Sequence, residues 1–213
     1  GFWGDEWPAA PRGLHTAFHA YHASLTELST RLRRLFMAAV GLREDFLDSA
    51  FDRHLSTIRV NDYPEQTTAP LPGQLRAGAH TDYGFLTILR SEDAPGGLQV
   101  QNRAGDWLDV PNIADTFVVN IGDAMMRWTN DRWISTPHRV VNPPPGSQGP
   151  TRRQSIAFFN NPNRDAVIEC LPVFRSAGEP VKYQPVTYGD YAEARHKQAH
   201  GAHKTLGLDR HQT

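Results

Sequence analysis

The chain of 213 residues has only one cysteine and no long apolar run. Cys170 cannot form an internal disulfide, which excludes the disulfide-rich scaffolds of small secreted proteins. It lies in the apolar run 167–171, so we predict a buried structural thiol. No apolar run approaches the roughly 20 residues that a membrane-spanning helix needs. We therefore expect no membrane partner and a cytoplasmic protein.

An excess of charge of either sign is also absent. Lys and Arg number 22 and Asp and Glu number 23, which gives a formal net charge of −1 at pH 7. This balance gives no electrostatic reason to expect a nucleic-acid partner. The composition is 39% hydrophobic and 21% charged, which is ordinary for a globular domain and excludes a disordered chain or a collagen-like fibre. One large domain is the expected organisation.

The first quarter of the chain has the spacing of an amphipathic helix. Apolar residues alternate at intervals of four and three from near Pro11 to a stop at Gly41, namely Leu14, Phe18, Tyr21, Leu25, Leu28, Leu32, Leu35 and Ala39. A shorter helix is expected next, with four inward-facing residues, Phe46, Leu47, Ala50 and Phe51. The tail from Tyr188 to about Lys204 predicts a last helix, with Asp190 as its N-cap.

Short strand-like runs fill the middle of the chain and are separated by Gly, Pro, Asn and Asp. They lie at 57–60, 85–89, 98–100, 107–110, 116–121, 133–135, 139–141, 155–159 and 166–169. Several short strands with close turn signals favour a sandwich or barrel over alternating βαβ units. We therefore divide the chain into a helical segment at 1–55, a β core at 56–186 and a helical tail at 187–213.

Two of the ten histidines stand at strand starts with a carboxylate nearby. His80 and Asp82 are two residues apart, which on an extended chain places both side chains on one face. His138 begins another expected strand. Two imidazoles and one carboxylate form the facial triad that suits non-haem Fe(II), although zinc also binds such a set. The pattern predicts a metal site whose ion the spacing alone does not choose.

A second pair of polar residues follows on the next strand. Arg153 and Ser155 are two apart and share a face, and the apolar stretch after them indicates a buried strand. A guanidinium grips a carboxylate with two hydrogen bonds, and a hydroxyl adds a third. The pair predicts a site for a small dicarboxylate held between metal and guanidinium. Arg152, which immediately precedes Arg153, is expected to point to the opposite face of the strand.

The sequence resembles one known family, the iron(II)/2-oxoglutarate-dependent oxygenases of the isopenicillin N synthase-like group. The resemblance covers nearly the whole chain in the family's order, and as a set its motifs are highly specific. They are Trp7-Pro8, Asn61-Asp62-Tyr63-Pro64, His80-Thr81-Asp82-Tyr83-Gly84, Gly97-Leu98-Gln99-Val100, Trp107-Leu108-Asp109-Val110-Pro111, Val119-Asn120-Ile121-Gly122-Asp123, His138-Arg139-Val140, Arg153-Gln154-Ser155-Ile156 and Phe158-Phe159.

The fold implied by this resemblance is mainly β with helices. It is a double-stranded β-helix, or jelly-roll, core with a long N-terminal helix and a C-terminal helix packed on it. The resemblance also implies that His80, Asp82 and His138 are the Fe(II) ligands.

The cosubstrate implied by the resemblance is 2-oxoglutarate. Arg153 and Ser155 would then lie at its far carboxylate. Asn61 and Tyr63 match an Asn-x-Tyr element near the cosubstrate, although a polar strand end is the simpler interpretation of both.

The resemblance implies an oxidoreductase, a non-haem Fe(II)- and 2-oxoglutarate-dependent dioxygenase. It would use O₂ to oxidise a small organic substrate, most simply by hydroxylation, and release succinate and CO₂. One alternative is an oxidase that uses Fe(II) and O₂ without 2-oxoglutarate, with Arg153 on the substrate's own carboxylate. A second is an inactive jelly-roll binding protein, against which the intact triad argues. A third is a zinc hydrolase, for which no general base is evident.

The start of the chain differs from the family pattern. Members carry roughly a hundred residues before the Trp-Pro element, whereas this sequence begins with Gly1-Phe2-Trp3. We expect that a family N-terminal region, which contributes strands and loops over the site, is missing before residue 1.

Overall fold

A computed structural model describes residues 7–8, 11–175 and 179–205, with side chains of the last helix described up to residue 199. The three α-helices it describes are α1 (Leu14–Ala39), α2 (Asp123–Trp128) and α3 (Tyr188–Thr205), with short 3-10 turns at Asp48–Ala50 and Pro172–Phe174. The strands are β1 (Thr57–Tyr63), β2 (Ala77–His80), β3 (Leu86–Ser91), β4 (Gly97–Gln101), β5 (Trp107–Asp109), β6 (Val118–Ile121), β7 (His138–Val141), β8 (Arg153–Asn160), β9 (Val167–Ile168) and β10 (Val186–Thr187).

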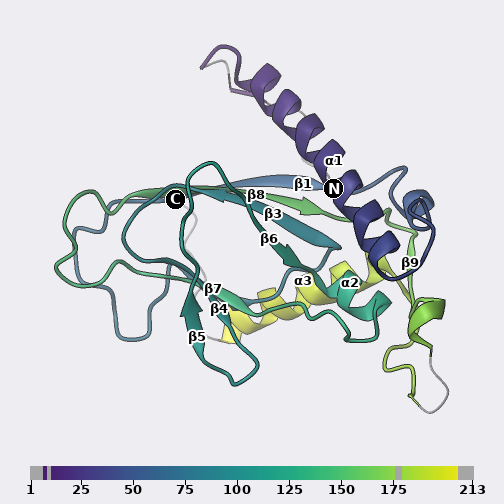
Figure 1. Cartoon of the computed structure of the whole chain (residues 1–213). Helices are drawn as coiled ribbons and strands as arrows, with labels where there is room; N and C mark the ends of the chain where they lie inside the picture. The colour runs from purple at the N-terminus through teal and green to yellow at the C-terminus, as the bar shows by residue number, and fades with distance from the viewer. Residues whose placement is uncertain (1–6, 9–10, 176–178, 206–213) are drawn as a thin grey trace.

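Two four-stranded antiparallel sheets make up the core of the described chain. The first has the order β1-β8-β3-β6 and the second the order β2-β7-β4-β5, while β9 and β10 pair separately. In Figure 1 the two sheets lie opposite one another, with α1 across the outer side of the first sheet and α3, in yellow, below that sheet and beside α2. This is the expected double-stranded β-helix with a long N-terminal and a C-terminal helix, and the fold prediction is confirmed.

The first sheet has two different faces because neighbouring side chains of a strand point in opposite directions. In β8, Phe158 is buried on the outer face, where its ring lies 5.4 Å from the ring of His22 on α1. The alternate residues of β8 face the second sheet and line a cavity between the two sheets, namely Arg153, Ser155, Ala157 and Phe159. One face of the sheet therefore builds the core and the other builds the site.

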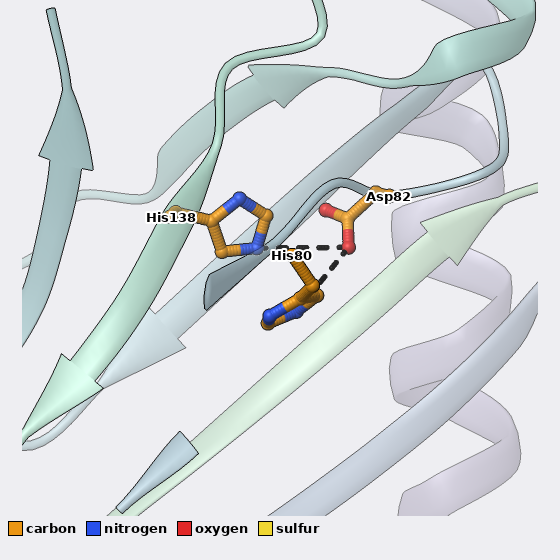
Figure 2. A group of neighbouring side chains, drawn as sticks. All are labelled: His80, Asp82 and His138. Atoms are coloured by element: carbon orange, nitrogen blue, oxygen red, sulfur yellow. Dashed lines mark ion pairs between the residues drawn. The ribbon is translucent and has the colours of Figure 1, made fainter. Parts of the chain in front are cut away.

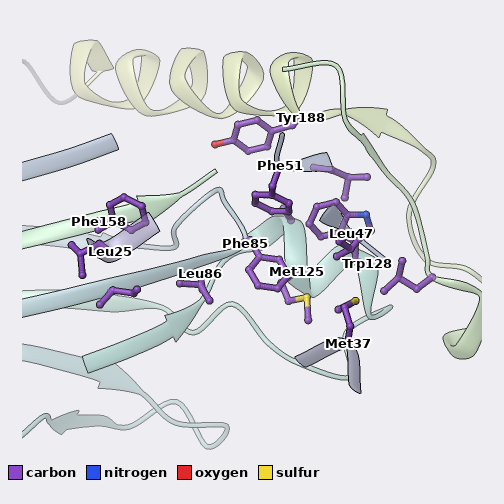
Figure 3. Close-up of a cluster of buried hydrophobic side chains, with 14 residues drawn as sticks. Leu25, Met37, Leu47, Phe51, Phe85, Leu86, Met125, Trp128, Phe158 and Tyr188 are labelled. Carbon is purple, nitrogen blue, oxygen red and sulfur yellow. The ribbon is translucent and has the colours of Figure 1, made fainter. Parts of the chain in front are cut away.

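The hydrophobic core lies between the outer face of the first sheet, α1 and α2 (Figure 3). Trp128 on α2 is 2% exposed, and its ring centroid lies 6.0 Å from that of Phe85. Phe51 packs against the same Phe85 ring at 5.6 Å. Truncating a buried aromatic of this kind costs about 3–5 kcal/mol of folding free energy. This packing anchors the loop before β3, which carries part of the site.

The predicted long helix is present and ends as expected. Gly41 takes a left-handed conformation with φ 77°, which glycine adopts without strain. The prediction of a shorter helix after Gly41 was wrong, because only a 3-10 turn forms there and Phe46 is 42% exposed. The Asp48 carboxylate instead accepts hydrogen bonds from Arg33 and Arg34 of α1. Side-chain contacts to α1 thus hold this segment, which places Leu47 and Phe51 inside as expected.

Most of the expected strands form, with shifted ends. The strand expected at 133–135 does not form, because the Trp133 N–H donates to the Thr129 hydroxyl and its ring packs 5.0 Å from that of Phe36. β2, β10 and α2 were not predicted. β2 has the sequence Ala-Gly-Ala-His, which has little intrinsic strand preference, and it forms by pairing with β7.

The start of α3 also differs from the expectation. Tyr188 is its first residue, so Asp190 lies inside the first turn rather than at the N-cap. The Thr187 hydroxyl accepts the Asp190 N–H and donates to the Asp190 carboxylate. Thr187 therefore caps the helix, and the residue chosen from sequence is its partner.

The remaining expectations concern burial and hydropathy. Cys170 is 1% exposed and is a free thiol, as predicted. Among the helices of the described chain, none is both long and apolar enough to cross a membrane.

Candidate active site

Three potential metal ligands converge at one end of the cavity between the sheets. His80 ends β2 and His138 begins β7, and the two residues are paired in the sheet register. Asp82 lies in the loop that leads to β3. Its Oδ1 is 4.0 Å from Nε2 of His80 and 3.7 Å from Nε2 of His138, as Figure 2 shows. One ligand atom from each of the three residues lies within 4.8 Å of the others, so they can hold one metal ion.

The predicted convergence of the three side chains holds, but not for the predicted reason. The strand ends at His80, so Asp82 does not share its face through strand alternation. The loop is held instead by its own contacts. The Asp82 carbonyl accepts the Asp123 N–H at 2.7 Å and the Ser135 hydroxyl at 3.5 Å.

Both imidazoles are oriented through their other ring nitrogen. Nδ1 of His80 lies 2.8 Å from the Gly78 carbonyl, and Nδ1 of His138 lies 3.1 Å from the Thr136 carbonyl. A carbonyl only accepts hydrogen bonds, so each Nδ1 carries the proton and each Nε2 offers a lone pair. Desolvation lowers the pKa of His80 below its ordinary value, and its bond to Gly78 offsets part of that effect. Neutral imidazoles of this tautomer are the metal-binding form.

The Asp82 carboxylate is buried and asymmetrically bonded. Its Oδ2 accepts hydrogen bonds from the Thr87 hydroxyl at 2.6 Å and from the Asn120 side-chain amide at 2.8 Å. Its Oδ1 faces the two histidines. The donor set therefore fits a divalent metal, with two imidazole nitrogens and one carboxylate oxygen aimed at the same point.

Arg153 brings a buried positive charge into the same cavity. It is 4% exposed, and its Nη1 has no hydrogen-bond partner among the described residues. Burial lowers the pKa of its guanidinium, and the nearby Arg76 charge adds to this, while Tyr63 acts in the opposite direction. An unpaired donor on a buried cation favours the binding of an anion beside it. Arg152 points outward and pairs with Asp62, as its position in the strand predicts.

Three further residues surround the guanidinium. Ser155 is 4% exposed and accepts a long hydrogen bond of 3.5 Å from the Asn61 amide. The Tyr63 ring lies 5.7 Å from the Arg153 Cζ, opposite it in the register. All of the site residues expected from the sequence thus line the one cavity. Their roles there remain predictions.

The sequence reasoning missed two residues that contact the triad. Thr87 and Asn120 were both placed correctly in expected strands, at 85–89 and 116–121, but neither was assigned to the site. Both face the cavity because Thr87 and Asn120 are direct partners in the β3–β6 register. Only the pairing of the two strands places them at the same carboxylate, and spacing within one strand does not reveal such a pairing.

Comparison with known proteins agrees with this geometry. Residues 55–162 match the model of the 2OG-Fe(II) oxygenase superfamily, which is just over half of the chain. The chain therefore belongs to this superfamily of oxidoreductases, whose cofactors are Fe(II) and 2-oxoglutarate.

Individual relatives support the assignment. The 2-oxoglutarate-Fe(II) type oxidoreductase hxnY of Emericella nidulans is 35% identical over 202 residues, which is 92% of this chain and 56% of the relative. A full-length Neurospora crassa protein crystallised with alpha-KG and thymine superposes with a TM-score of 0.82 at 34% identity, over 91% of this chain and 60% of that one. JOX2 in complex with 2OG, Fe and JA gives a TM-score of 0.78 at 34% identity, over 88% and 54%. The chain spans little more than half the length of these relatives.

Proposed function

We propose that the chain is the catalytic part of an Fe(II)- and 2-oxoglutarate-dependent dioxygenase that hydroxylates a small organic molecule. One observation carries the proposal. The buried, unpaired guanidinium of Arg153 lies in the same cavity as the carboxylate and imidazoles of the triad. A metal at one end and a cation at the other match a molecule with an oxo acid at one end and a carboxylate at the other.

Each group of residues in the cavity would have its own role. His80, Asp82 and His138 would hold Fe(II), and Arg153 would bind the far carboxylate of 2-oxoglutarate. When bound, the two groups supply O₂-dependent redox chemistry, in which 2-oxoglutarate is converted to succinate and CO₂ while the substrate is oxidised. Thr87 and Asn120 would hold the Asp82 carboxylate in place.

The cosubstrate end of the cavity is polar and the rest is mostly apolar. Ser155 would donate its hydroxyl to the same carboxylate as Arg153, with Asn61 holding the serine oxygen. The Tyr63 ring would hold the guanidinium from the side. Apolar side chains from both sheets would exclude water between the two ends, namely Leu89, Leu98, Val100, Val118 and Val140.

The substrate is proposed to be a small molecule. Solved relatives hold thymine in one case and JA in another. The single reduced thiol, Cys170, fits a proposed cytoplasmic location.

The experiment is a measurement of O₂ uptake and succinate formation by purified protein with Fe(II), ascorbate and 2-oxoglutarate. We expect slow succinate formation without substrate, and its loss in Asp82→Ala together with metal binding. Arg152→Lys is the matched control and should behave as wild type. O₂ uptake without succinate, in the presence of a substrate panel, would favour the oxidase alternative. Absence of metal binding by the wild type would favour a binding protein.

A further inference from the structure

We propose that Arg195 is a positioning residue for Asp82, through which the C-terminal helix α3 holds the loop that carries this metal ligand. The inference goes beyond the proposed function, although it rests on Asp82 as a ligand of the metal. It arises from contacts that reach this loop from residues outside the cavity, because neither Arg195 nor any other residue of α3 lines it.

Arg195 contacts both chain neighbours of Asp82. Its Nη2 donates a hydrogen bond of 3.0 Å to the Thr81 hydroxyl. Its Cζ lies 4.9 Å from the centroid of the Tyr83 ring, which is within the range of a cation–π contact. The three loop residues lie between β2 and β3, outside the pairing of either sheet. One guanidinium therefore holds the loop on each side of the ligand.

A second connection runs from α3 to the same loop through Asp123, the first residue of α2. The Asp123 N–H donates to the Asp82 carbonyl at 2.7 Å. The buried Asp123 carboxylate accepts a hydrogen bond of 2.7 Å from the Tyr191 hydroxyl, and its Oδ2 lies 3.6 Å from Nη2 of Arg195. Burial raises the pKa of Tyr191 and the Asp123 carboxylate adds to this, so the hydroxyl keeps its proton and donates.

Tyr191 and Arg195 act from one face of α3, because residues four apart in a helix are neighbours on its surface. Figure 1 shows α3 running beside α2, where this face meets both Asp123 and the loop. One turn of α3 therefore reaches the Asp82 main chain by two routes, directly through Arg195 and indirectly through Asp123.

The position of this loop matters because Asp82 is the ligand that lies outside the sheets. His80 and His138 lie on β2 and β7 and are paired in the register, so the sheet fixes their separation. A shift of the loop would move Oδ1 of Asp82 relative to both imidazoles, which would not follow it. Thr87 and Asn120 hold the carboxylate from the cavity side, and α3 holds the main chain from the other.

Another basic residue of the same helix shows the contrast. Lys197 pairs with Glu193 four residues earlier at 2.8 Å, and both side chains are largely exposed. Such a pair contributes little to stability and contacts only the helix itself. The Arg195 guanidinium is directed away from its own helix, to a buried carboxylate on α2 and to the loop. A cation beside a buried carboxylate stabilises its charge, so this contact is the stronger of the two.

The test compares Mn(II) binding by the full-length wild type and Arg195→Ala in titration calorimetry. We expect the variant to lose about 10-fold in metal affinity, as is typical when a residue that orients a metal ligand is removed. Millimolar methylguanidinium should restore most of that affinity, because the Arg195 side chain is partly exposed and the ion can enter the space it leaves. Lys197→Ala is the control on the same helix and should bind as wild type with or without methylguanidinium.

A second readout distinguishes positioning of the ligand from a general loss of stability. The visible absorption of bound Co(II) depends on the geometry of its ligands. At saturating Co(II), we expect an altered spectrum for Arg195→Ala that returns to the wild-type spectrum with methylguanidinium. Tyr191→Phe, which removes only the hydroxyl on Asp123, should weaken Mn(II) binding by a smaller factor and should not respond to methylguanidinium.

Two results would overturn this inference alone. They are wild-type Mn(II) affinity and Co(II) spectrum in Arg195→Ala, and a loss of affinity that methylguanidinium does not restore. If Arg195→Ala does not fold, Arg195→Lys and Tyr191→Phe serve in its place, and wild-type affinity in both would overturn it. Failure of the wild type itself to bind Mn(II) would overturn the proposed function, and this inference with it.

Discussion

The Thr87 hydroxyl donates a 2.6 Å hydrogen bond to Oδ2 of Asp82. Together with the Asn120 amide, it occupies one carboxylate oxygen and leaves Oδ1 facing the two imidazoles. The two strands β3 and β6, which form part of the cavity wall, therefore also determine which carboxylate oxygen of Asp82 can bind a metal. This coupling between the sheet register and the metal site leads to the first prediction.

Replacing Thr87 with Val removes the hydroxyl and keeps the shape of the side chain. Oδ2 of Asp82 then loses one of its two donors, so we expect metal affinity to fall roughly 10- to 100-fold. Calorimetric titration of the variant with Mn(II) measures the change. Thr87→Ser keeps the hydroxyl and should bind as wild type. Equal affinity of the Val variant and the wild type would show that the hydrogen bond does not position the ligand.

Arg153 and Arg152 form a matched pair of adjacent arginines. Arg153→Lys replaces a buried fork with a point charge, so we expect 2-oxoglutarate affinity to fall about 10- to 100-fold while metal affinity stays within a few-fold. Arg152→Lys, which faces outward, should change neither. Fluorescence or calorimetric titration with 2-oxoglutarate on the Mn(II)-loaded protein distinguishes the two. Similar cosubstrate affinity in both variants would remove Arg153 from the proposed role.

Gly122 is required by a close backbone approach rather than by its φ angle. A Cβ at this position would lie 2.3 Å from the Gly84 carbonyl oxygen, and backbone cannot move aside cheaply. We expect Gly122→Ala to lower the free energy of unfolding by about 1–3 kcal/mol. Metal affinity should fall as well, because the next residue, Asp123, donates its N–H to the Asp82 carbonyl. Gly78→Ala meets open space and should keep wild-type stability in chemical denaturation. Equal stability of the two variants would contradict the steric argument.

Asp48 links acid stability to the anchoring of α1. Burial alone would raise its pKa, but hydrogen bonds and charge from Arg34 and Arg33 outweigh this and lower it. Arg33 is 4% exposed, so Asp48→Asn leaves a buried cation with a weaker partner. We expect a loss of about 2 kcal/mol near pH 7, since the Asp48 carboxylate is partly exposed.

The pH dependence of this loss follows from the lowered pKa. The stabilisation is complete above the unfolded pKa of about 3.9 and is lost as the pH falls through the lower folded value. Urea unfolding of wild type and Asp48→Asn should therefore differ by a constant amount between pH 6 and 8, and the difference should shrink as the pH falls below about 4. A difference that grows at low pH would contradict the assignment.

The elements that could be predicted from the sequence are those with a strong pattern of their own. The regular apolar spacing of α1 and its stop at Gly41 predicted that helix closely, and the alternation in β8 predicted which side Arg153 faces. β2 and α2 escaped prediction because neither has a strong local preference. β2 is stabilised by pairing with β7, and α2 by burying Trp128 in the core.

The same distinction applies to the candidate site, where residues with a local sequence pattern were predicted and residues brought together by strand pairing were not. Residue types and spacing, with the family resemblance, predicted His80, Asp82 and His138. Thr87 and Asn120 were missed because their relevance arises from cross-strand register. The sequence alone does not show that a threonine in one strand and an asparagine in another bind the same carboxylate, because this depends on how the two strands pair.

The central claim is that one cavity holds the metal at the triad and 2-oxoglutarate between the metal and Arg153. The most direct measurement is anomalous diffraction from crystals grown anaerobically with Fe(II) and 2-oxoglutarate. The account predicts one iron peak within bonding distance of Nε2 of both histidines and Oδ1 of Asp82, with density for the oxo acid extending from it to the Arg153 guanidinium. An iron peak elsewhere, or a far carboxylate bound away from Arg153, would contradict it.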